Sequence, residues 1–194
     1  GGAGRGAGRG GLTPEQQAAQ AEERRKMYQD VLDTYRKLGA KLEAIDLPDL
    51  PLANQIGFIL EVESAASFDE LTRSGDVDLL RTGPSASTWP NTFKTARFVP
   101  AVEYLRAQRG RTILMRQMGE FMSKFDVLLS AGSDATLGVT NLTGHPAMTV
   151  KCGFQGGLPR ILMLTGQLYD EATMCRVALA YEQATEWKDR HPKI

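Results

Sequence analysis

The sequence has 194 residues, enough for one domain whose core buries very roughly 70% of the surface of the unfolded chain. Its 23 basic and 23 acidic residues cancel, so it lacks the positive field with which proteins bind nucleic acids or anionic membranes. No apolar run approaches the ~20 residues that a membrane-spanning helix needs. We therefore expect neither nucleic acid nor membrane among the partners.

Metal-binding side chains are scarce in this sequence. It contains Cys152, Cys175, His145 and His191 but no CxxC pair, so a zinc site has almost no ligands to draw on. We expect each cysteine to be a buried, reduced thiol, which suits a reducing compartment such as the cytoplasm. We expect no metal and no other cofactor.

The first eleven residues are only Gly, Ala and Arg. This composition predicts a disordered tail over residues 1–12, because it offers too little apolar surface to fold; a short RNA-binding tether is the alternative. The sequence begins with Gly-Gly and lacks the features of a signal peptide, which indicates a partial sequence. One partial domain is expected over residues 13–194.

A helix is predicted from Thr13 to Gly39. It begins with the capping-box pattern Thr-Pro-Glu-Gln, after which apolar residues recur on one helical face. Glycine is a typical helix terminator, and the alternating residues 41–47 predict a strand.

Residues 52–72 form a largely apolar stretch that predicts a second helix. Glu61 and Glu63 lie within it, but carboxylates two residues apart point to different sides of a helix and cannot form an acid–base pair by themselves. We interpret both as surface carboxylates.

A loop rich in Gly, Pro, Ser and Thr follows at residues 81–91. Trp89 and Phe93 either anchor this loop, which is the interpretation we prefer, or line the mouth of a substrate site. A long helix is then predicted from Pro100 to about Lys124. Its apolar contacts are expected from Val102, Leu105, Ile113, Leu114 and Phe121.

The remaining elements alternate between strand and helix. We predict a buried strand at 126–129, a loop at 130–138, and two paired strands at 147–152 and 161–164 around a Gly/Pro-rich loop. Lys151 is a charged residue within a strand, which indicates a sheet edge or a face left open by missing chain. The alternation predicts an α/β fold.

Several short motifs follow one another over about fifty residues near the end of the sequence. They are Asn-Leu-Thr-Gly-His-Pro-Ala, Cys-Gly-Phe, the Leu-Pro that opens the next strand, Tyr-Asp-Glu-Ala-Thr and Ala-Tyr-Glu-Gln-Ala-Thr. The last two belong to an amphipathic helix predicted from Asp170 to about Lys188. In this order the motifs resemble the C-terminal end of the amidase signature family. The resemblance extends over roughly residues 13–192, and it implies a mixed β-sheet covered by helices.

The resemblance also implies a chemistry. Enzymes of the family hydrolyse amides, or transfer their ammonia, through a Ser–cis-Ser–Lys arrangement. In the family those residues lie N-terminal to the part matched here, and no Gly-Gly-Ser-Ser-like run occurs in this sequence. We therefore expect no catalytic residue in this chain, and no activity without the missing N-terminal amidase segment.

A Ser-His-Asp site built from Ser133, His145 and Asp134 is conceivable, but their spacing gives it no support. His145 is more simply interpreted as a hydrogen-bonded structural residue.

Asp134 is the candidate substrate-binding residue. It lies seven residues before Asn141, and the resembling stretch of amidotransferase A subunits carries an aspartate at that spacing, which holds the amino group of glutamine. The alternative is a turn residue that bonds its own backbone.

We therefore expect the C-terminal portion of an amidase signature hydrolase that acts on a small-molecule amide. The alternative within the family is the A subunit of a glutamine-dependent tRNA amidotransferase. The alternative from another class is a non-catalytic binding or scaffold protein derived from an amidase. The substrate and the oligomeric state are left open.

Overall fold

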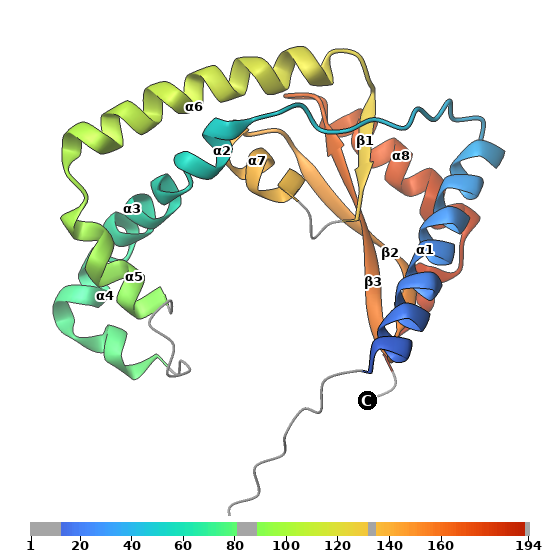
Figure 1. The fold of residues 1–194 in the computed structure, drawn as a ribbon, viewed down its shortest axis with the longest axis horizontal. Helices are drawn as coiled ribbons and strands as arrows, with labels where there is room; N and C mark the ends of the chain where they lie inside the picture. Colours follow the sequence, from blue (N-terminus) through green and yellow to red (C-terminus); the bar gives the residue numbers. More distant parts are fainter. Residues whose placement is uncertain (1–12, 81–88, 132–134, 193–194) are drawn as a thin grey trace, which may run out of the picture.

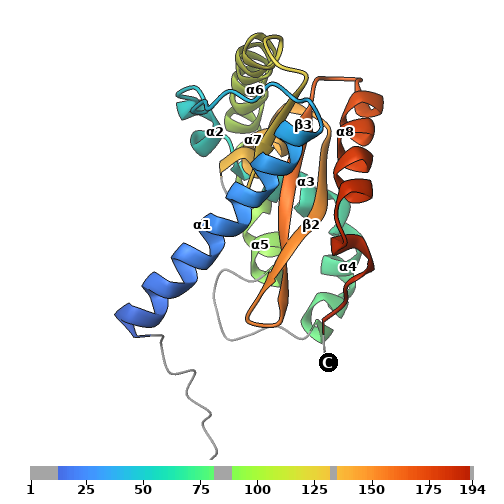
Figure 2. The same ribbon diagram turned by 90° about the vertical axis from the view of Figure 1, so that its right-hand side faces the viewer.

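A computed structural model of the chain describes residues 13–80, 89–131 and 135–192. The predicted tail at 1–12 lies outside these ranges. The described residues form a three-stranded sheet covered by helices, from which a group of further helices extends (Figures 1 and 2). The α/β class and the helix-covered sheet are confirmed. The described strands pair only antiparallel, whereas the resemblance implies a mixed sheet.

The first helix, α1 (Pro14–Lys37), begins as predicted. The hydroxyl of Thr13 accepts from the amide of Gln16 at 3.2 Å, and the Gln16 side chain accepts from the amide of Thr13 at 2.9 Å. This capping box pairs two amides that a helix start would otherwise leave unpaired. The helix ends before Gly39, whose φ of +88° favours glycine.

The predicted strand at 41–47 is wrong. These residues have no regular structure and pair with none of the described strands. The predicted helix at 52–72 is divided into three. They are α2 (Pro51–Gln55), α3 (Phe58–Ser67) and α4 (Asp69–Ser74). Gly57 lies at the first break, where its low helix propensity favours an interruption.

The next helices complete a group that we call the helical arm, residues 51–80 and 89–122. After the 3-10 helix η1 (Asp76–Leu79) it contains α5 (Trp89–Thr95), η2 (Ala96–Phe98) and α6 (Ala101–Met122). Figure 1 shows the arm reaching away from the sheet, with α6 as the long connection back to it.

The aromatic residues of the arm pack against one another. Phe93 is buried and stacks on Phe68, with 4.7 Å between ring centroids, and the Trp89 ring lies 5.6 Å from that of Phe93. Phe93 thus packs against Phe68, and Trp89 begins a helix rather than lying in a loop, but the anchoring of the predicted loop stays a prediction. Residues 81–88 of the predicted loop lie outside the described ranges.

The sheet contains β1 (Val127–Ser130), β2 (Ala147–Gln155) and β3 (Leu158–Gly166) in the order β1-β3-β2. A two-residue turn of Gly156 and Gly157, both with positive φ, joins β2 to β3 as a tight hairpin. Helix α7 (Ala135–Thr143) lies between β1 and β2 in sequence. Helix α8 (Glu171–Ala184) and the 3-10 helix η3 (Trp187–Asp189) follow β3. The three strands predicted from residue 126 onward are thus confirmed. The predicted last helix is also confirmed, but it ends at Ala184 rather than near Lys188.

The sheet separates two hydrophobic cores, because neighbouring residues of a strand point to opposite faces. Leu162 and Leu164 of β3 are buried on one face with α1 and α8, in contact with residues such as Val31 and Tyr181. On the other face, Leu128 packs against the core formed by α6, α7 and the start of the arm.

Lys151 lies in β2, at one edge of the sheet, as its charge predicted. Its ammonium group donates to the backbone carbonyls of Lys188 and Arg190, at 2.9 and 2.7 Å. These two hydrogen bonds hold residues 188–190 beside this edge of the sheet. None of the helices described is both long and apolar enough to cross a membrane.

Candidate functional site

The predicted site residues fall between the end of β1, at Ser130, and the start of α7. Asp134 and Ser133 lie in the segment 132–134, outside the residues that the structure describes. The role of Asp134 therefore stays a prediction. The structure defines the frame of this segment: the end of β1, helix α7 and the turn that follows it.

Helix α7 occupies part of the predicted loop 130–138. Its apolar side chains Val139 and Leu142 are buried in the core shared with α6. A second set of side chains, spaced four and three residues apart on one helical face, is also buried: Thr136, Thr140 and Thr143. Packing on two faces outweighs the weak helix propensity of the Thr- and Gly-containing sequence, which is why the loop prediction is wrong here.

The turn after α7 holds His145. Only 5% of this residue is exposed, and its Nδ1 lies 2.8 Å from the hydroxyl oxygen of Thr143. Burial lowers the pKa of His145 from its ordinary value, so the neutral imidazole is favoured. The nine residues of α7, which span about 13 Å, separate His145 from the segment 132–134. These contacts support the structural interpretation of His145.

Two buried hydroxyl groups lie on one face of the sheet near the end of β1. Ser130 is opposite Met163, and Thr165 is opposite Leu128, so alternation places all four side chains on the face covered by α6 and α7. The oxygens of Ser130 and Thr165 have no hydrogen-bond partner among the described residues.

Arg111 of α6 holds the end of α7. Its Nε donates to the carbonyl oxygen of Leu142 at 2.7 Å, which satisfies one of the carbonyls that a helix end leaves unpaired. Glu63 of α3 lies 3.9 Å from the Arg111 guanidinium and accepts from Tyr104 and Gln108, both at 3.0 Å. Glu63 is a surface carboxylate as predicted, but its spacing to Glu61 gave no sign of this network, which crosses three helices.

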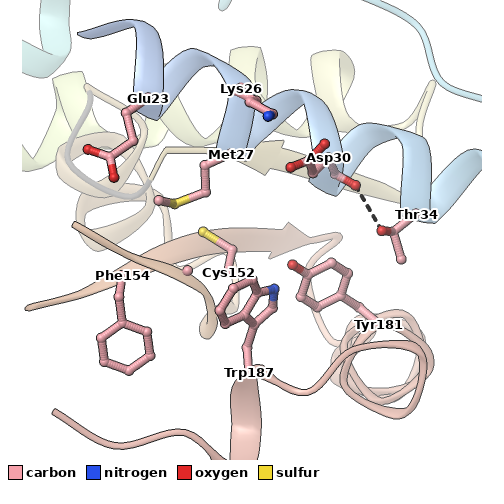
Figure 3. A pocket seen from close by; sticks show the side chains of 10 residues that line it. Glu23, Lys26, Met27, Asp30, Thr34, Cys152, Phe154, Tyr181 and Trp187 are labelled. Atoms are coloured by element: carbon pink, nitrogen blue, oxygen red, sulfur yellow. Dashed lines mark hydrogen bonds between the residues drawn. The ribbon is translucent and has the colours of Figure 1, made fainter. Parts of the chain in front are cut away.

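A cavity of about 220 Å³ lies between α1 and β2 (Figure 3). Figure 3 shows the Cys152 thiol facing Met27 of α1, with Tyr181 and Trp187 on the same side of the cavity as Cys152. Burial raises the pKa of the Cys152 thiol to about 11, so it is protonated at neutral pH and a poor nucleophile. The cavity is consequently a weak candidate for catalysis.

The two cysteines differ in their surroundings. Cys152 is a buried free thiol, as predicted, but the prediction for Cys175 is wrong, because this residue is exposed. It lies on α8 beside Met174, whose side chain is buried against the sheet. One residue turns a helix by about 100°, which carries Cys175 onto the outer face. In the described ranges, no three Cys, His, Asp or Glu side chains are grouped to hold a metal ion.

Comparison with curated proteins gives two informative relatives. The chain is 27% identical to an amidase of Pseudomonas putida over 191 residues, which covers 84% of this chain and 40% of the amidase. It is 30% identical to the A subunit of the glutamyl-tRNA(Gln) amidotransferase of Synechococcus sp. (strain JA-3-3Ab) over 212 residues, which covers 89% of this chain and 41% of that relative. No protein-family model matches the chain.

Solved structures share the fold. A bacterial aryl acylamidase of the amidase signature family matches 87% of this chain and 41% of its own, with a TM-score of 0.66 and 19% identity. The peptide amidase of Stenotrophomonas maltophilia matches 86% of this chain and 40% of its own, with a TM-score of 0.67 and 18% identity. In sequence and in fold the chain is thus related to the amidase signature family, and it spans about two fifths of the length of these relatives.

Proposed function

We propose that this chain is the C-terminal portion of an amidase signature hydrolase, which cleaves the carbon–nitrogen bond of a small-molecule amide. The observation that carries the proposal is the extent of the similarity to the Pseudomonas putida amidase, which covers 84% of this chain. The shared fold with an aryl acylamidase supports it. A cytoplasmic location is part of the proposal.

The catalytic Ser–cis-Ser–Lys group lies, on this proposal, in an N-terminal amidase segment that joins this chain. The described residues offer two candidate groups for chemistry of their own, and neither is suited to it. His145 is buried against Thr143, and the Cys152 thiol is held protonated. This chain then supplies the frame of the substrate site, from β1 through the segment 132–134 to α7.

Within this frame, Asp134 holds an amino group of the substrate. A carboxylate paired with an ammonium group in a desolvated pocket makes a charge-assisted hydrogen bond, worth about 1.5–3 kcal/mol. The competing role is local: a turn residue whose carboxylate bonds its own backbone, as aspartate commonly does in Ser/Gly-rich loops.

Replacing Asp134 by Asn in the complete enzyme separates these roles. A substrate-holding carboxylate predicts that apparent affinity for amino-bearing amides falls roughly ten- to a hundredfold, while neutral amides are barely affected. The measurement is kcat/KM for a matched pair of amides with and without the amino group. Equal losses for both, together with a lower melting temperature, would leave only the turn role.

Amide hydrolysis tests the proposed function itself. We expect the chain alone to release arylamine from simple aryl amides no faster than buffer. The same chain, joined to an N-terminal amidase segment that carries the Ser–cis-Ser–Lys group, should turn them over. Turnover by the chain alone that disappears in Ser133→Ala would contradict the proposal, because it would place the nucleophile in this chain.

The A subunit of a glutamine-dependent tRNA amidotransferase is the second candidate. The 30% identity to one such protein favours it. Ammonia release from glutamine by the joined protein, with aryl amides left intact, would select this candidate. Binding of amides with no turnover of either compound would select the non-catalytic scaffold instead.

A further inference from the structure

We infer that the cavity between α1 and β2 binds a small organic cation that carries a methylated ammonium group. The charge of such a cation would lie beside carboxylates of α1, and its methyl groups against aromatic rings of α8 and η3. The cavity lies on the face of the sheet that α1 and α8 cover, whereas α7 packs on the opposite face. The inference therefore concerns a second site and does not depend on the proposed amide hydrolysis.

The cavity is set by the close approach of α1 to β2 at Gly153, which lines it. A Cβ atom added to Gly153 would lie 2.5 Å from the sulfur of Met27, so any larger residue there would displace the methionine. The cavity has a volume of about 220 Å³. A cavity of about 150 Å³ can hold benzene, whereas drug-sized ligands occupy about 300–1,000 Å³. One group the size of a ring or of a tetraalkylammonium ion therefore fits.

Two aromatic side chains form one side of the cavity, Tyr181 of α8 and Trp187 of η3 (Figure 3). The Trp187 indole donates a hydrogen bond to the Tyr181 hydroxyl, which fixes the two rings relative to each other. Trp187 already attracts one cation, because the guanidinium carbon of Arg190 lies 5.1 Å from its ring centroid. Arg190 is not among the residues that line the cavity, so its guanidinium group does not fill it.

The charges around the cavity favour a positive ligand. Two carboxylates of α1 line it, Glu23 and Asp30, against the single ammonium group of Lys26. Gln155 donates to the Glu23 carboxylate at 3.0 Å, which holds it in place. Burial, and to a lesser extent the charge of Asp30, raises the pKa of Tyr181, so the phenol is neutral and Asp30 acts on it electrostatically.

The interior of the cavity favours a methylated ammonium group over other cations. Sulfur atoms and rings face it, from Met27 and Cys152 as well as the two aromatic residues, and burial raises the pKa of the Cys152 thiol to about 11, so it carries no charge. A primary ammonium group would find few acceptors there for its N–H groups. A quaternary ammonium group has no N–H group, and aromatic rings are its usual partners in proteins.

Isothermal titration calorimetry of the 194-residue chain tests the inference with choline as the probe. Ethanolamine and the neutral isostere of choline, in which carbon replaces the ammonium nitrogen, are the ligand controls. Trp187→Phe and Trp187→Leu both lose the indole donor, but only phenylalanine keeps a ring. Asp30→Asn removes a charge at the cavity, and Asp33→Asn, on the same helix but outside the lining, is its control.

We expect choline to bind at millimolar concentration or below, and more tightly than either control ligand. Trp187→Leu should bind it roughly threefold or more weakly than Trp187→Phe, because the cation loses an aromatic face. Asp30→Asn should also weaken binding roughly threefold or more, while Asp33→Asn changes it little. Gly153→Ala should weaken binding as well, because the displaced Met27 side chain takes up part of the cavity. Circular dichroism confirms that the variants are folded.

Several results would overturn the inference. Choline that does not bind, or a neutral isostere that binds as tightly, would show that the cavity has no preference for a cation. Equal affinities of the two Trp187 variants, equal effects of Asp30→Asn and Asp33→Asn, or unchanged binding in Gly153→Ala would place any bound choline elsewhere. A Gly/Ser peptide with one trimethyl-lysine that binds at least tenfold more tightly than choline would assign the site to a protein partner instead. None of these measurements depends on hydrolysis of an amide.

Discussion

In the sheet region, β3 is paired on both sides and its residues 162–166 are buried. The helices of the arm bury one face and leave the other in contact with solvent. Large apolar side chains that are exposed occur mainly on the helical arm: Leu60, Phe68, Leu79, Leu80, Trp89, Phe98, Val102, Leu105, Ile113 and Met115. Those of the sheet region are scattered singly.

The difference lies in how much apolar surface each region leaves uncovered. A monomer rarely exposes contiguous apolar surface, and three of the exposed residues, Val102, Leu105 and Ile113, lie along one side of α6. The sheet region has the helices it needs on both faces. The arm leaves more apolar surface exposed, and the chain spans about two fifths of the length of the relatives that it matches.

The largest expected effect contrasts the two regions directly. Leu164, fully buried at the centre of β3, should cost about 2–5 kcal/mol of unfolding free energy when replaced by alanine, because it leaves a cavity. Leu105→Ala on the exposed side of α6 should change it by less than about 0.5 kcal/mol. Urea unfolding measures both. Similar losses for the two variants would mean that the arm is packed as tightly as the sheet.

The second prediction concerns the exposed side of α6. We expect the isolated chain to bind hydrophobic dyes and to self-associate. Replacing Val102, Leu105 and Ile113 together by lysine should reduce dye fluorescence roughly twofold or more, with unfolding free energy unchanged. A matched triple lysine variant of scattered residues in the sheet region serves as control: Leu158, Tyr169 and Leu179. An equal reduction of dye fluorescence in both variants would show that the exposed side of α6 is not the preferred binding surface of the dye.

Arg111 gives the third contrast, since it links the arm to α7. Arg111→Met removes the donor to the Leu142 carbonyl and should cost about 1 kcal/mol, because the side chain is partly exposed. Amide hydrogen exchange in α7 should also become faster in this variant. Arg109→Met, an exposed arginine on the same helix, is the control and should change neither quantity. Unaltered exchange in Arg111→Met would remove any role of the network in holding α7.

The smallest effect is a pH dependence. Burial lowers the pKa of His145, so folding favours the neutral ring, and the stability that this provides is present above the ordinary pKa of 6.5. It should be lost progressively as the pH falls below that value. Urea unfolding of the original chain between about pH 7.5 and 5 should show a steeper decline than His145→Gln, by a fraction of the Arg111 effect. Parallel declines would mean that His145 does not titrate differently on folding.

The same comparison explains what the sequence could predict. The hairpin, the α1 capping box and the start of α8 were predicted correctly because each depends on residues close in sequence, such as Gly156-Gly157 or Thr13 with Gln16. The exposed side of α6 was predicted as buried, because apolar spacing identifies a stripe but not whether another element covers it. Val102 and Leu105 are exposed for that reason.

The frame of the candidate site was harder to predict. Helix α7 depends on packing against α6, and the bond from Arg111 to Leu142 joins residues 31 positions apart, a separation that no local pattern reports. The segment 132–134 was located by resemblance alone. The structure describes β1 and α7, the elements on either side of Asp134 in the sequence. The contact of Asp134 with substrate stays a prediction.

The two edges of the sheet are unequal, and this limits how copies of the chain could stack. Lys151 places a charge and a bound segment at the β2 edge, whereas none of the four residues of β1, Val127–Ser130, is charged. A fibre needs two adhesive edges on every unit, and a charged lysine is a common means of blocking one. If two copies paired through β1, neither copy would have another edge in its described sheet that could pair with a third. Self-association by this route would therefore end at a pair.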